Sequence, residues 1–308
     1  MTGTNDFEYI RYDLPVEKVA RVMLARPEMN NLQNLDMLYE IDRAYKRAVQ
    51  DPYVKVIITA ADGPDFSLGH DAFTDHWYKK DGKPLRDKID PVTEFAGGYN
   101  DPGHAGHMAV EQEVFLGLCW RWRNLPKPTI AQVHGRVYNG GLMLMWPCDL
   151  VVASEDATFA ESVVEAGVAC DEFFVHVWEL GHRKAKEFLF ASEVLSAEEM
   201  HRLGSVNHVV ARDKLEEFTL NMASRIAMRP SFALRTAKMA VNQSLDAQGM
   251  WSALQSAFSL HQLGHANASI KLGDIVDFES MMKIAESEGP SGASAAYQEI
   301  IARVAENQ

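Results

Sequence analysis

The chain has few cysteines, a deficit of basic residues and no long apolar run. Its three cysteines in 308 residues include no C-x-x-C pair, which argues against both a disulfide framework and a zinc site. Thirty Lys and Arg residues stand against 43 Asp and Glu, so the formal net charge is −13. Nucleic acids and anionic membranes attract basic surfaces, so this balance argues against both as partners.

Membrane and export signals are also absent from the sequence. The most apolar stretch, residues 140–153, is interrupted by Pro147 and Asp149 and is far shorter than the roughly 20 residues of a membrane span. The first ten residues lack the basic and apolar regions of a secretory signal. Together with the unpaired cysteines, these features predict a cytoplasmic protein.

The chain does have length and apolar content. Hydrophobic residues make up 47% of it, which is enough to bury a core without disulfides or metal ions. In the first two thirds, short β-branched runs alternate with segments of helical apolar spacing, and this alternation predicts an α/β fold. The predicted strands are 19–24, 54–59, 129–133 and 149–153, and the predicted helices are 35–49 and 114–122.

The last third of the chain is mostly helical. Ser196 and Glu199 form a capping-box pattern, and Gly204 is typical of a helix end. We therefore predict an α/β core over residues 1–211 and a helical C-terminal subdomain over residues 212–308. After a strand at 206–210, the predicted helices are 214–228, 231–246, 250–272 and 294–306.

Two glycine-containing turns follow predicted strands. Gly69 and His70 come after the strand at 54–59, and Gly140 comes after the strand at 129–133. Glycine at a strand-to-helix turn allows close approach of a ligand to the backbone and leaves N–H groups directed at it. Two such groups aimed at one carbonyl oxygen form an oxyanion hole. Ordinary turns use the same residues, so this pattern alone leaves both interpretations open.

Ordered motifs between residues 8 and 270 resemble those of the crotonase (enoyl-CoA hydratase/isomerase) superfamily. The resemblance implies a crotonase-like spiral of β-β-α repeats with a helical C-terminal trimerisation region, and hence a homotrimer or a dimer of trimers. It also implies an acyl-CoA thioester as substrate, with coenzyme A as part of the substrate and no separate cofactor. The matching segments are 24–32, 66–71, 127–135, 139–141, 148–153, 157–159 and 195–207.

The family's chemistry is stabilisation of a thioester enolate, and the resemblance places its two backbone donors at His70 and Gly140. The sequence departs from the hydratases at their two catalytic glutamates, where it has Met143 and Val163. Neither side chain exchanges a proton, so the standard hydration mechanism is not expected.

A substitute carboxylate follows Gly167. Several branches of the family, among them carbon–carbon hydrolases and dehalogenases, carry a catalytic acid five positions after this glycine, where this chain has Glu172 with Asp171 beside it. We take Glu172 as the first catalytic candidate and Asp171 as the second. The alternative is that both acids lie in the first turn of a helix that contains residues 173–178, where they would complement the helix dipole.

Other motif residues, and residues just past the oxyanion loop, are expected to line the substrate site. Residues 75–106 form an irregular insertion that resembles an elaborated lid, which suits a substrate bulkier than a short straight acyl chain. CoA is anionic, so Arg26 and the basic residues between 79 and 88 are candidates for its phosphates, although a solvated loop explains the latter equally well. The expected substrate- or CoA-binding residues are Arg26, Leu68, Gly69, Asp71, His76, Trp77, Gly141 and Val163.

The histidines give little support for a metal. His104 and His107 lie in a predicted loop, and His261 and His265 are four residues apart on a predicted helix. There is no H-E-x-x-H motif and no cluster of ligands at close sequence spacing. The sequence therefore predicts no metal site.

Two other functions stay open. One is a CoA-independent carbon–carbon bond hydrolase of cyclic β-diketones, which an acid at position 172 favours and Val164 disfavours, because that branch carries a histidine there. The other is a non-catalytic acyl-CoA-binding protein. The loss of both glutamates favours it, and the intact glycine turn at Gly140 disfavours it.

Overall fold

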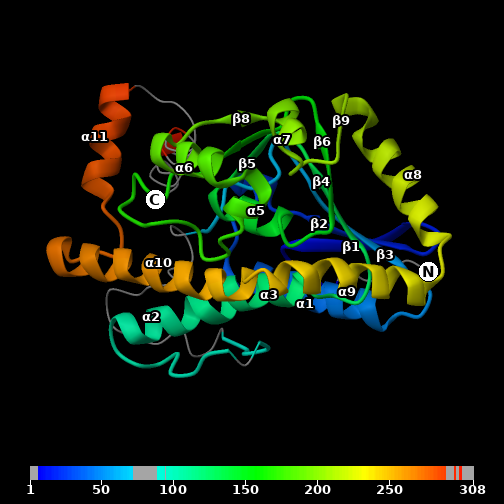
Figure 1. The fold of residues 1–308 in the computed structure, drawn as a ribbon, viewed down its shortest axis with the longest axis horizontal. Helices are drawn as coiled ribbons and strands as arrows, with labels where there is room; N and C mark the ends of the chain where they lie inside the picture. Colours follow the sequence, from blue (N-terminus) through cyan, green and yellow to red (C-terminus); the bar gives the residue numbers. More distant parts are fainter. Residues whose placement is uncertain (1–5, 72–88, 94, 289–294, 296–297, 300–308) are drawn as a thin grey trace.

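The computed structural model describes residues 6–71, 89–93, 95–288, 295 and 298–299 (Figure 1). A six-stranded sheet has the order β1-β2-β3-β4-β6-β9, and a three-stranded sheet has the order β5-β7-β8. β1 is antiparallel to β2, and the strands from β2 to β9 in the large sheet run parallel. The strands are β1 Ile10–Val16, β2 Val19–Leu24, β3 Val56–Ala61, β4 Thr129–Val133, β5 Arg136–Tyr138, β6 Leu150–Ser154, β7 Thr158–Ala160, β8 Leu195–Ser196 and β9 His208–Val210.

Helices surround the two sheets. A π-helical segment, Gln112–Gly117, joins α2 to α3, and a 3-10 turn, Asn139–Gly141, precedes α4. The α-helices are α1 Leu35–Gln50, α2 His104–Glu111, α3 Leu118–Arg123, α4 Leu142–Met145, α5 His176–Leu180, α6 His182–Ala191, α7 Ala197–Leu203, α8 Leu215–Ala227, α9 Ser231–Ala247, α10 Met250–Leu272 and α11 Phe278–Glu288.

The large sheet is buried on both faces. Successive side chains of a strand point to opposite sides. Accordingly, Ile57 packs in the cluster that contains α1, and Ile58 packs in a second cluster with Leu215 and Ala223 of α8. The near-continuous apolar sequence of β3 therefore follows from its place inside a parallel sheet covered on both faces.

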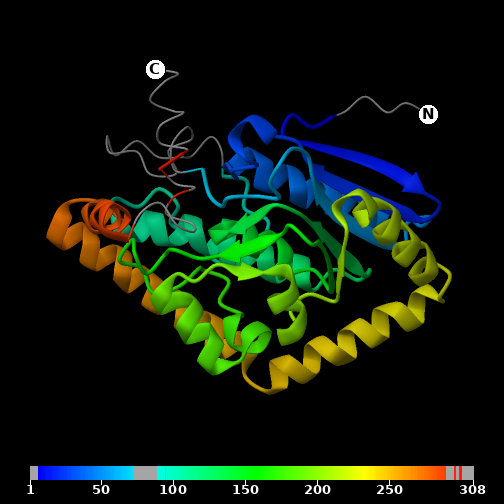
Figure 2. The ribbon, with the colours of Figure 1, turned by 90° about the horizontal axis from the view of Figure 1, so that it is seen from above.

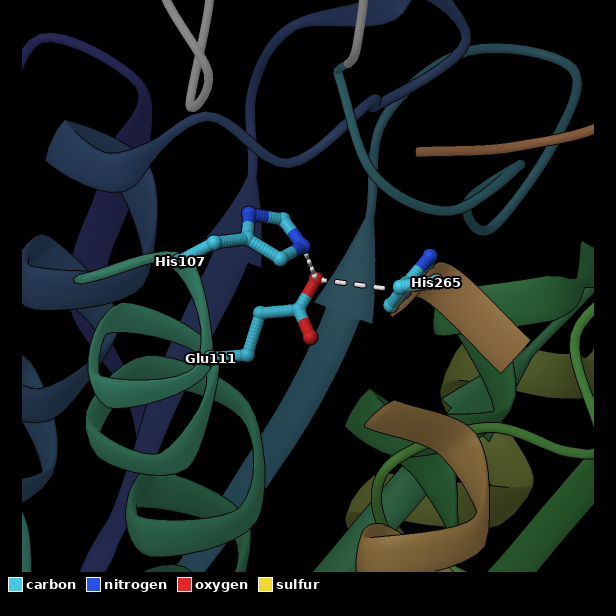
Figure 3. A group of neighbouring side chains, drawn as sticks. All are labelled: His107, Glu111 and His265. Atoms are coloured by element: carbon cyan, nitrogen blue, oxygen red, sulfur yellow. Dashed lines mark ion pairs between the residues drawn. The ribbon is translucent and has the colours of Figure 1, made fainter. Parts of the chain in front are cut away.

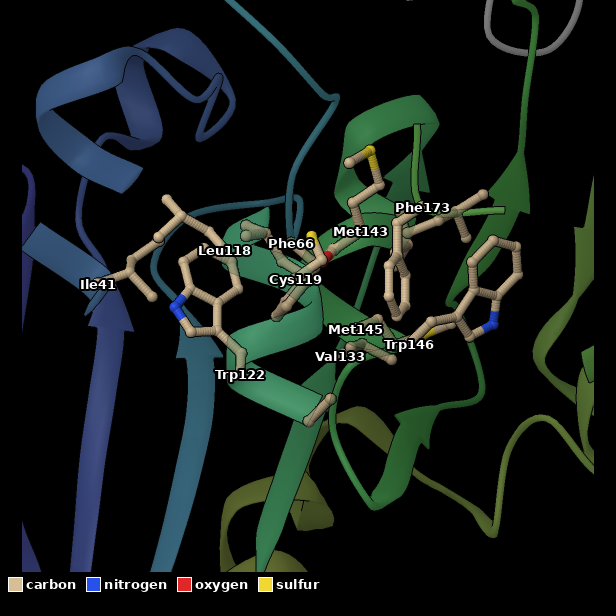
Figure 4. Packing of buried hydrophobic residues seen from close by; sticks show 14 of the residues in the cluster. Ile41, Phe66, Leu118, Cys119, Trp122, Val133, Met143, Met145, Trp146 and Phe173 are labelled. Atoms are coloured by element: carbon tan, nitrogen blue, oxygen red, sulfur yellow. The ribbon is translucent and has the colours of Figure 1, made fainter. Parts of the chain in front are cut away.

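The main core lies under the glycine turns. Phe66 and Phe173 are fully buried there, and Cys119 and Met143 lie between the large aromatic side chains of this region (Figure 4). Burial of each large apolar side chain contributes about 1.5–3 kcal/mol. Met143 is thus a core residue in this fold.

The sequence predicted the bounds of several long helices closely, and it predicted some other elements less well. The predicted helices at 35–49, 231–246 and 250–272 agree with α1, α9 and α10 to within a residue at each end. The Ser196 side chain accepts from Glu199 N, and Gly204 adopts the left-handed conformation, as the caps predicted. The strand predicted at 54–59 runs two residues later, and α11 was not predicted at all.

The predicted insertion and helical subdomain need correction in detail. The end of the insertion is helical, because α2 begins at His104. Of the helix predicted at 294–306, only residues 295 and 298–299 are described. The change to helices after residue 211 is present, but α8 shares a hydrophobic cluster with the sheet and so belongs to its core. The two-part division itself remains a prediction.

The helices that follow β9 do not all pack against the sheets. α9 has no buried residue and runs along the periphery of the molecule (Figure 2). α10 continues beside α2 on the far side of the sheets from α8 (Figure 1). Within the described part of the chain, none of the helices is long and apolar enough to span a membrane.

Candidate active site

The two glycine turns meet in the structure. Gly69 has φ +108°, and a Cβ atom added to it would lie 3.0 Å from Gly140 N. A Cβ on Gly141 would lie only 2.3 Å from the backbone oxygen of Ser67. The turns therefore approach more closely than residues with side chains permit, and the structure brings the two predicted oxyanion donors into neighbouring segments.

Gln33 holds these turns together. Its side-chain amide donates to Gly140 O at 2.8 Å and to Ser67 Oγ at 3.0 Å. Its backbone N–H donates to Gly69 O at 2.8 Å, and its carbonyl accepts from Asp71 N. The N–H and C=O of one peptide point in opposite directions. The bond to Gly69 O therefore directs the N–H of His70 away from Gln33.

The sequence analysis missed Gln33. The residue directly follows a matching motif segment, but its partners lie 34 to 107 positions away along the chain. A glutamine beside a motif gives no signal of such a role, because its contacts depend on how the turns fold back on each other.

The imidazole of His70 covers Gly140. A Cβ on Gly140 would lie 2.5 Å from His70 Cε1, and the His70 ring stacks on Phe115 with a centroid separation of 3.8 Å. On its other side, His70 Nε2 lies 3.6 Å from Glu172 Oε2. The predicted acid is therefore one imidazole ring away from the predicted oxyanion donor.

Asp171 and Glu172 are both buried, and they are not helical. α5 begins only at His176, so the alternative that they complement a helix dipole is wrong. Asp171 N donates to Glu161 Oε1 at 3.0 Å, and Asp171 Oδ2 has no hydrogen-bond partner among the described residues. The other oxygen of Glu161 pairs with His176, which makes Glu161 a structural group.

The two neighbouring acids titrate in opposite directions. Burial alone would raise the pKa of Glu172, but His261 and His70 outweigh burial, and the pKa is lowered. For Asp171, burial together with Glu161 and Glu172 raises the pKa well above its usual range. Such a divergence leaves one carboxylate to accept a proton and one carboxyl to donate one.

The other residues predicted to bind substrate or CoA lie in several parts of the structure. The Arg26 guanidinium is buried, donates to Asp71 at 2.6 Å and to Leu32 O at 3.0 Å, and so anchors the end of the oxyanion turn. Leu68 is buried in a small apolar cluster, and Val163 is half-buried beside Cys170. Contact of any of these residues with CoA remains a prediction.

Part of the predicted site cannot be placed. His76, Trp77 and the basic residues between 79 and 88 lie outside the described residues. The described part of the insertion is attached to the core through Glu113, whose carboxylate accepts from Val92 N at 2.6 Å.

The structure also brings three of the four paired histidines together around a carboxylate that the sequence did not point to. Glu111 Oε1 lies 2.8 Å from His107 Nε2 and 3.5 Å from His265 Nε2 (Figure 3). Glu111 Oε2 lies 3.3 Å from His261 Nε2, which in turn lies 3.6 Å from Glu172 Oε1. His107 is four residues from Glu111, but His261 and His265 could not be linked to it from sequence, because α2 and α10 are about 150 residues apart.

Comparison with known proteins gives a consistent picture. The family model for enoyl-CoA hydratase/isomerase matches residues 95–288. EchA13 of Mycobacterium tuberculosis is 41% identical over 268 residues, which cover 85% of this chain and 82% of EchA13.

Solved structures agree with this family. A probable enoyl-CoA hydratase from Mycobacterium smegmatis has a TM-score of 0.76 and 45% identity, with 87% of this chain and 99% of the other covered. An enoyl-CoA hydratase/isomerase from Xanthobacter autotrophicus has a TM-score of 0.73 and 28% identity, with 96% and 98% covered. The predicted crotonase-like fold is thereby confirmed.

Proposed function

Because the chain belongs to the enoyl-CoA hydratase/isomerase family, we propose that it acts on an acyl-CoA thioester through an enolate. The observation that carries this proposal is the junction of the two glycine turns, where Gly69 lies against Gly140 N and Gln33 orients the His70 peptide. The substrate's carbonyl oxygen would accept from the N–H groups of His70 and Gly140. The loss of one such donor typically costs roughly 10²- to 10³-fold in turnover.

Glu172 is the proposed acid/base. It is buried and lies one imidazole ring from Gly140, next to where the α-carbon of a bound thioester would stand. Asp171 is the second candidate, as a proton donor, because its Oδ2 has no other partner among the described residues. General acid–base catalysis by such a group is worth roughly 10²- to 10⁴-fold.

Within this family activity, we favour double-bond migration over hydration. Addition of water uses both hydratase glutamates, whose positions hold Met143 and Val163. Migration needs one base that removes a proton from the α-carbon of a 3-enoyl thioester and returns it to the γ-carbon of the dienolate, which leaves a 2-enoyl thioester. One carboxylate at position 172 is sufficient for this transfer.

The test is turnover of 3-enoyl-CoA thioesters of several chain lengths, followed by the absorbance of the conjugated product and by exchange of the α-proton in D₂O. Glu172→Gln is expected to keep thioester binding but to lower turnover by at least ~100-fold. Glu198→Gln, an exposed acid on α7, is the matched control and should not alter it. Unchanged turnover in Glu172→Gln contradicts the assignment.

The alternatives give different results in the same assay. A non-catalytic protein would bind the thioester without exchange of the α-proton, and a β-diketone hydrolase would cleave cyclic diketones without binding any acyl-CoA. Formation of a 3-hydroxyacyl product would instead establish hydration. No cofactor beyond the CoA of the substrate is needed in the proposed reaction.

We also propose a homotrimer, or a dimer of such trimers, located in the cytoplasm. The support for assembly is α9, which buries no residue and exposes Phe232, Met239 and Val241. Apolar side chains gathered on one exposed helix are typical of a contact with another subunit. Light scattering on the purified chain tests the assembly, and cell fractionation tests the location.

A further inference from the structure

We propose that His107, Glu111, His261 and His265 form a divalent metal site suited to Zn²⁺, which joins α10 to α2. This is a closed site of four protein ligands with a structural role. The proposal goes against the sequence-based prediction of no metal, and it stands on the described residues alone, independently of any acyl-CoA activity.

The fold makes the four side chains converge. His107 and Glu111 are four residues apart on α2, and His261 and His265 are four residues apart on α10, so each pair projects from one helix face. The two helices pack beside each other, and in Figure 3 His107 and His265 approach the same Glu111 oxygen from different directions.

The separations between donor atoms fit one small cation. Zinc–nitrogen and zinc–oxygen bonds of about 2.0–2.2 Å in a tetrahedron place the ligand atoms roughly 3.3–3.5 Å apart. The Glu111 carboxylate oxygens lie 2.8 Å from His107, 3.3 Å from His261 and 3.5 Å from His265. His261 Nε2 and His265 Nε2 are 2.9 Å apart. Three of the donors, from His107, Glu111 and His265, already lie within 4.8 Å of one another. His261 faces the other Glu111 oxygen, so rotation of that carboxylate is needed for it to complete the set.

The backbone prepares two of the histidines as ligands. His261 Nδ1 donates to Cys170 O at 2.5 Å, and His265 Nδ1 donates to Ile275 O at 2.7 Å. With the proton on Nδ1, the lone pair of each Nε2 faces the centre of the cluster. In proteins, a metal-binding histidine is oriented by a hydrogen bond from its other ring nitrogen, the one that does not bind the metal, to a carbonyl.

The buried cluster needs a proton or a cation between its donor atoms. All four side chains are at most 8% exposed. Two nitrogen lone pairs held 2.9 Å apart repel each other unless a proton or a cation lies between them. Three imidazole nitrogens and one carboxylate oxygen are a ligand set that favours Zn²⁺ over Mg²⁺ or Ca²⁺, which prefer oxygen.

The test uses the full, tag-free chain, stripped with a chelator and titrated with Zn²⁺ alone against a chromophoric competitor. One tightly bound ion per chain is expected. His265→Ala and Glu111→Gln should weaken binding by at least about 100-fold, since even outer partners of a metal ligand are worth roughly 10- to 100-fold. His182→Ala removes an exposed histidine from α6 and should leave binding unchanged.

Measurements on the unaltered chain keep the proposal testable if a variant misfolds. Co²⁺ in place of Zn²⁺ should give the intense visible absorption of a tetrahedral site, and addition of Zn²⁺ should raise the melting temperature. Absence of stoichiometric binding, or binding that Glu111→Gln and His182→Ala alter equally, overturns the metal site. Metal binding is measured without any acyl-CoA, so failure of this proposal and failure of the proposed function are distinguishable.

Discussion

At the scale of single residues, Gly140 and Gly141 differ in what surrounds them. A Cβ on Gly140 meets only the His70 side chain, whereas a Cβ on Gly141 meets the backbone of Ser67. We expect Gly140→Ala to fold, because a ring can shift, and to lose roughly 10²-fold in kcat through a displaced oxyanion donor. Steady-state kinetics and thermal melting of the purified variant test this.

Gly141→Ala is the comparison for that prediction. The backbone of Ser67 cannot move aside as a side chain can. We therefore expect Gly141→Ala to lower the free energy of unfolding by several kcal/mol, about the cost of overpacking a core. If Gly140→Ala is instead the less stable of the two, the account of the glycine turns is wrong.

Gln33 is predicted to act on turnover more than on binding. Gln33→Leu leaves the acceptors Gly140 O and Ser67 Oγ without their amide donor, a loss of about 1–3 kcal/mol. The turns should then shift relative to each other, which lowers kcat about 10-fold or more while KM changes little.

The control for Gln33 is Gln248→Leu, which removes an exposed amide bonded within its own helix region. Gln248→Leu should change neither kcat nor KM. An increase in KM alone in Gln33→Leu would indicate that Gln33 serves binding rather than orientation of the donors.

At this scale, some site residues could be identified from the sequence and others could not. His70, Gly140 and Glu172 belong to motifs that are local in the chain, so the family resemblance located them. Gln33, and Glu111 in its contacts with α10, act through partners far away in sequence, and only the folded chain brings those partners within reach. Their roles could not have been inferred from residue type and spacing.

At the scale of elements, α5 carries a pH-sensitive contribution to stability. Burial raises the pKa of Glu179 to about 7, against the opposing effects of Ser205 and His176. Between about 4.5 and 7 the folded chain keeps a proton that the unfolded chain has released. Stability from this group is therefore present at low pH and is lost as pH rises through 7.

Replacing this carboxyl by an amide should remove the pH dependence. We expect Glu179→Gln to gain about 1–3 kcal/mol over the unaltered chain at pH 8 and little at pH 4, as urea unfolding would measure. Glu198→Gln, on exposed α7 surface, should show no such difference. A gain of equal size at both pH values would exclude the carboxyl as its cause.

Elements differed in how well local sequence predicted them. α1 has clear apolar spacing over many residues, and α10 is bounded by Gly249 and Gly273, so the ends of both agreed with the prediction. The π-helical turn at 112–117 was missed because its extra residue per turn depends on packing against the core rather than on local propensity. β3 was displaced by two residues because a doubly buried strand has no polar alternation to mark its ends.

At the scale of the whole molecule, the acidic charge and the proposed substrate are compatible. The net charge of −13 excludes a broad basic surface, but CoA needs only a few local cations. Arg26 was one candidate, and its buried pairing with Asp71 makes it an anchor of the oxyanion turn. Contact of the basic residues between 79 and 88 with the CoA phosphates remains a prediction.

The contact between α10 and α2 also imposes an order on synthesis. The oxyanion turns and both buried acids have left the ribosome well before His261 is translated, since domains form as the chain emerges. Until α10 arrives, Glu111 and Glu172 both lack His261. In the nascent chain, both acids therefore stay hydrated until α10 packs over them.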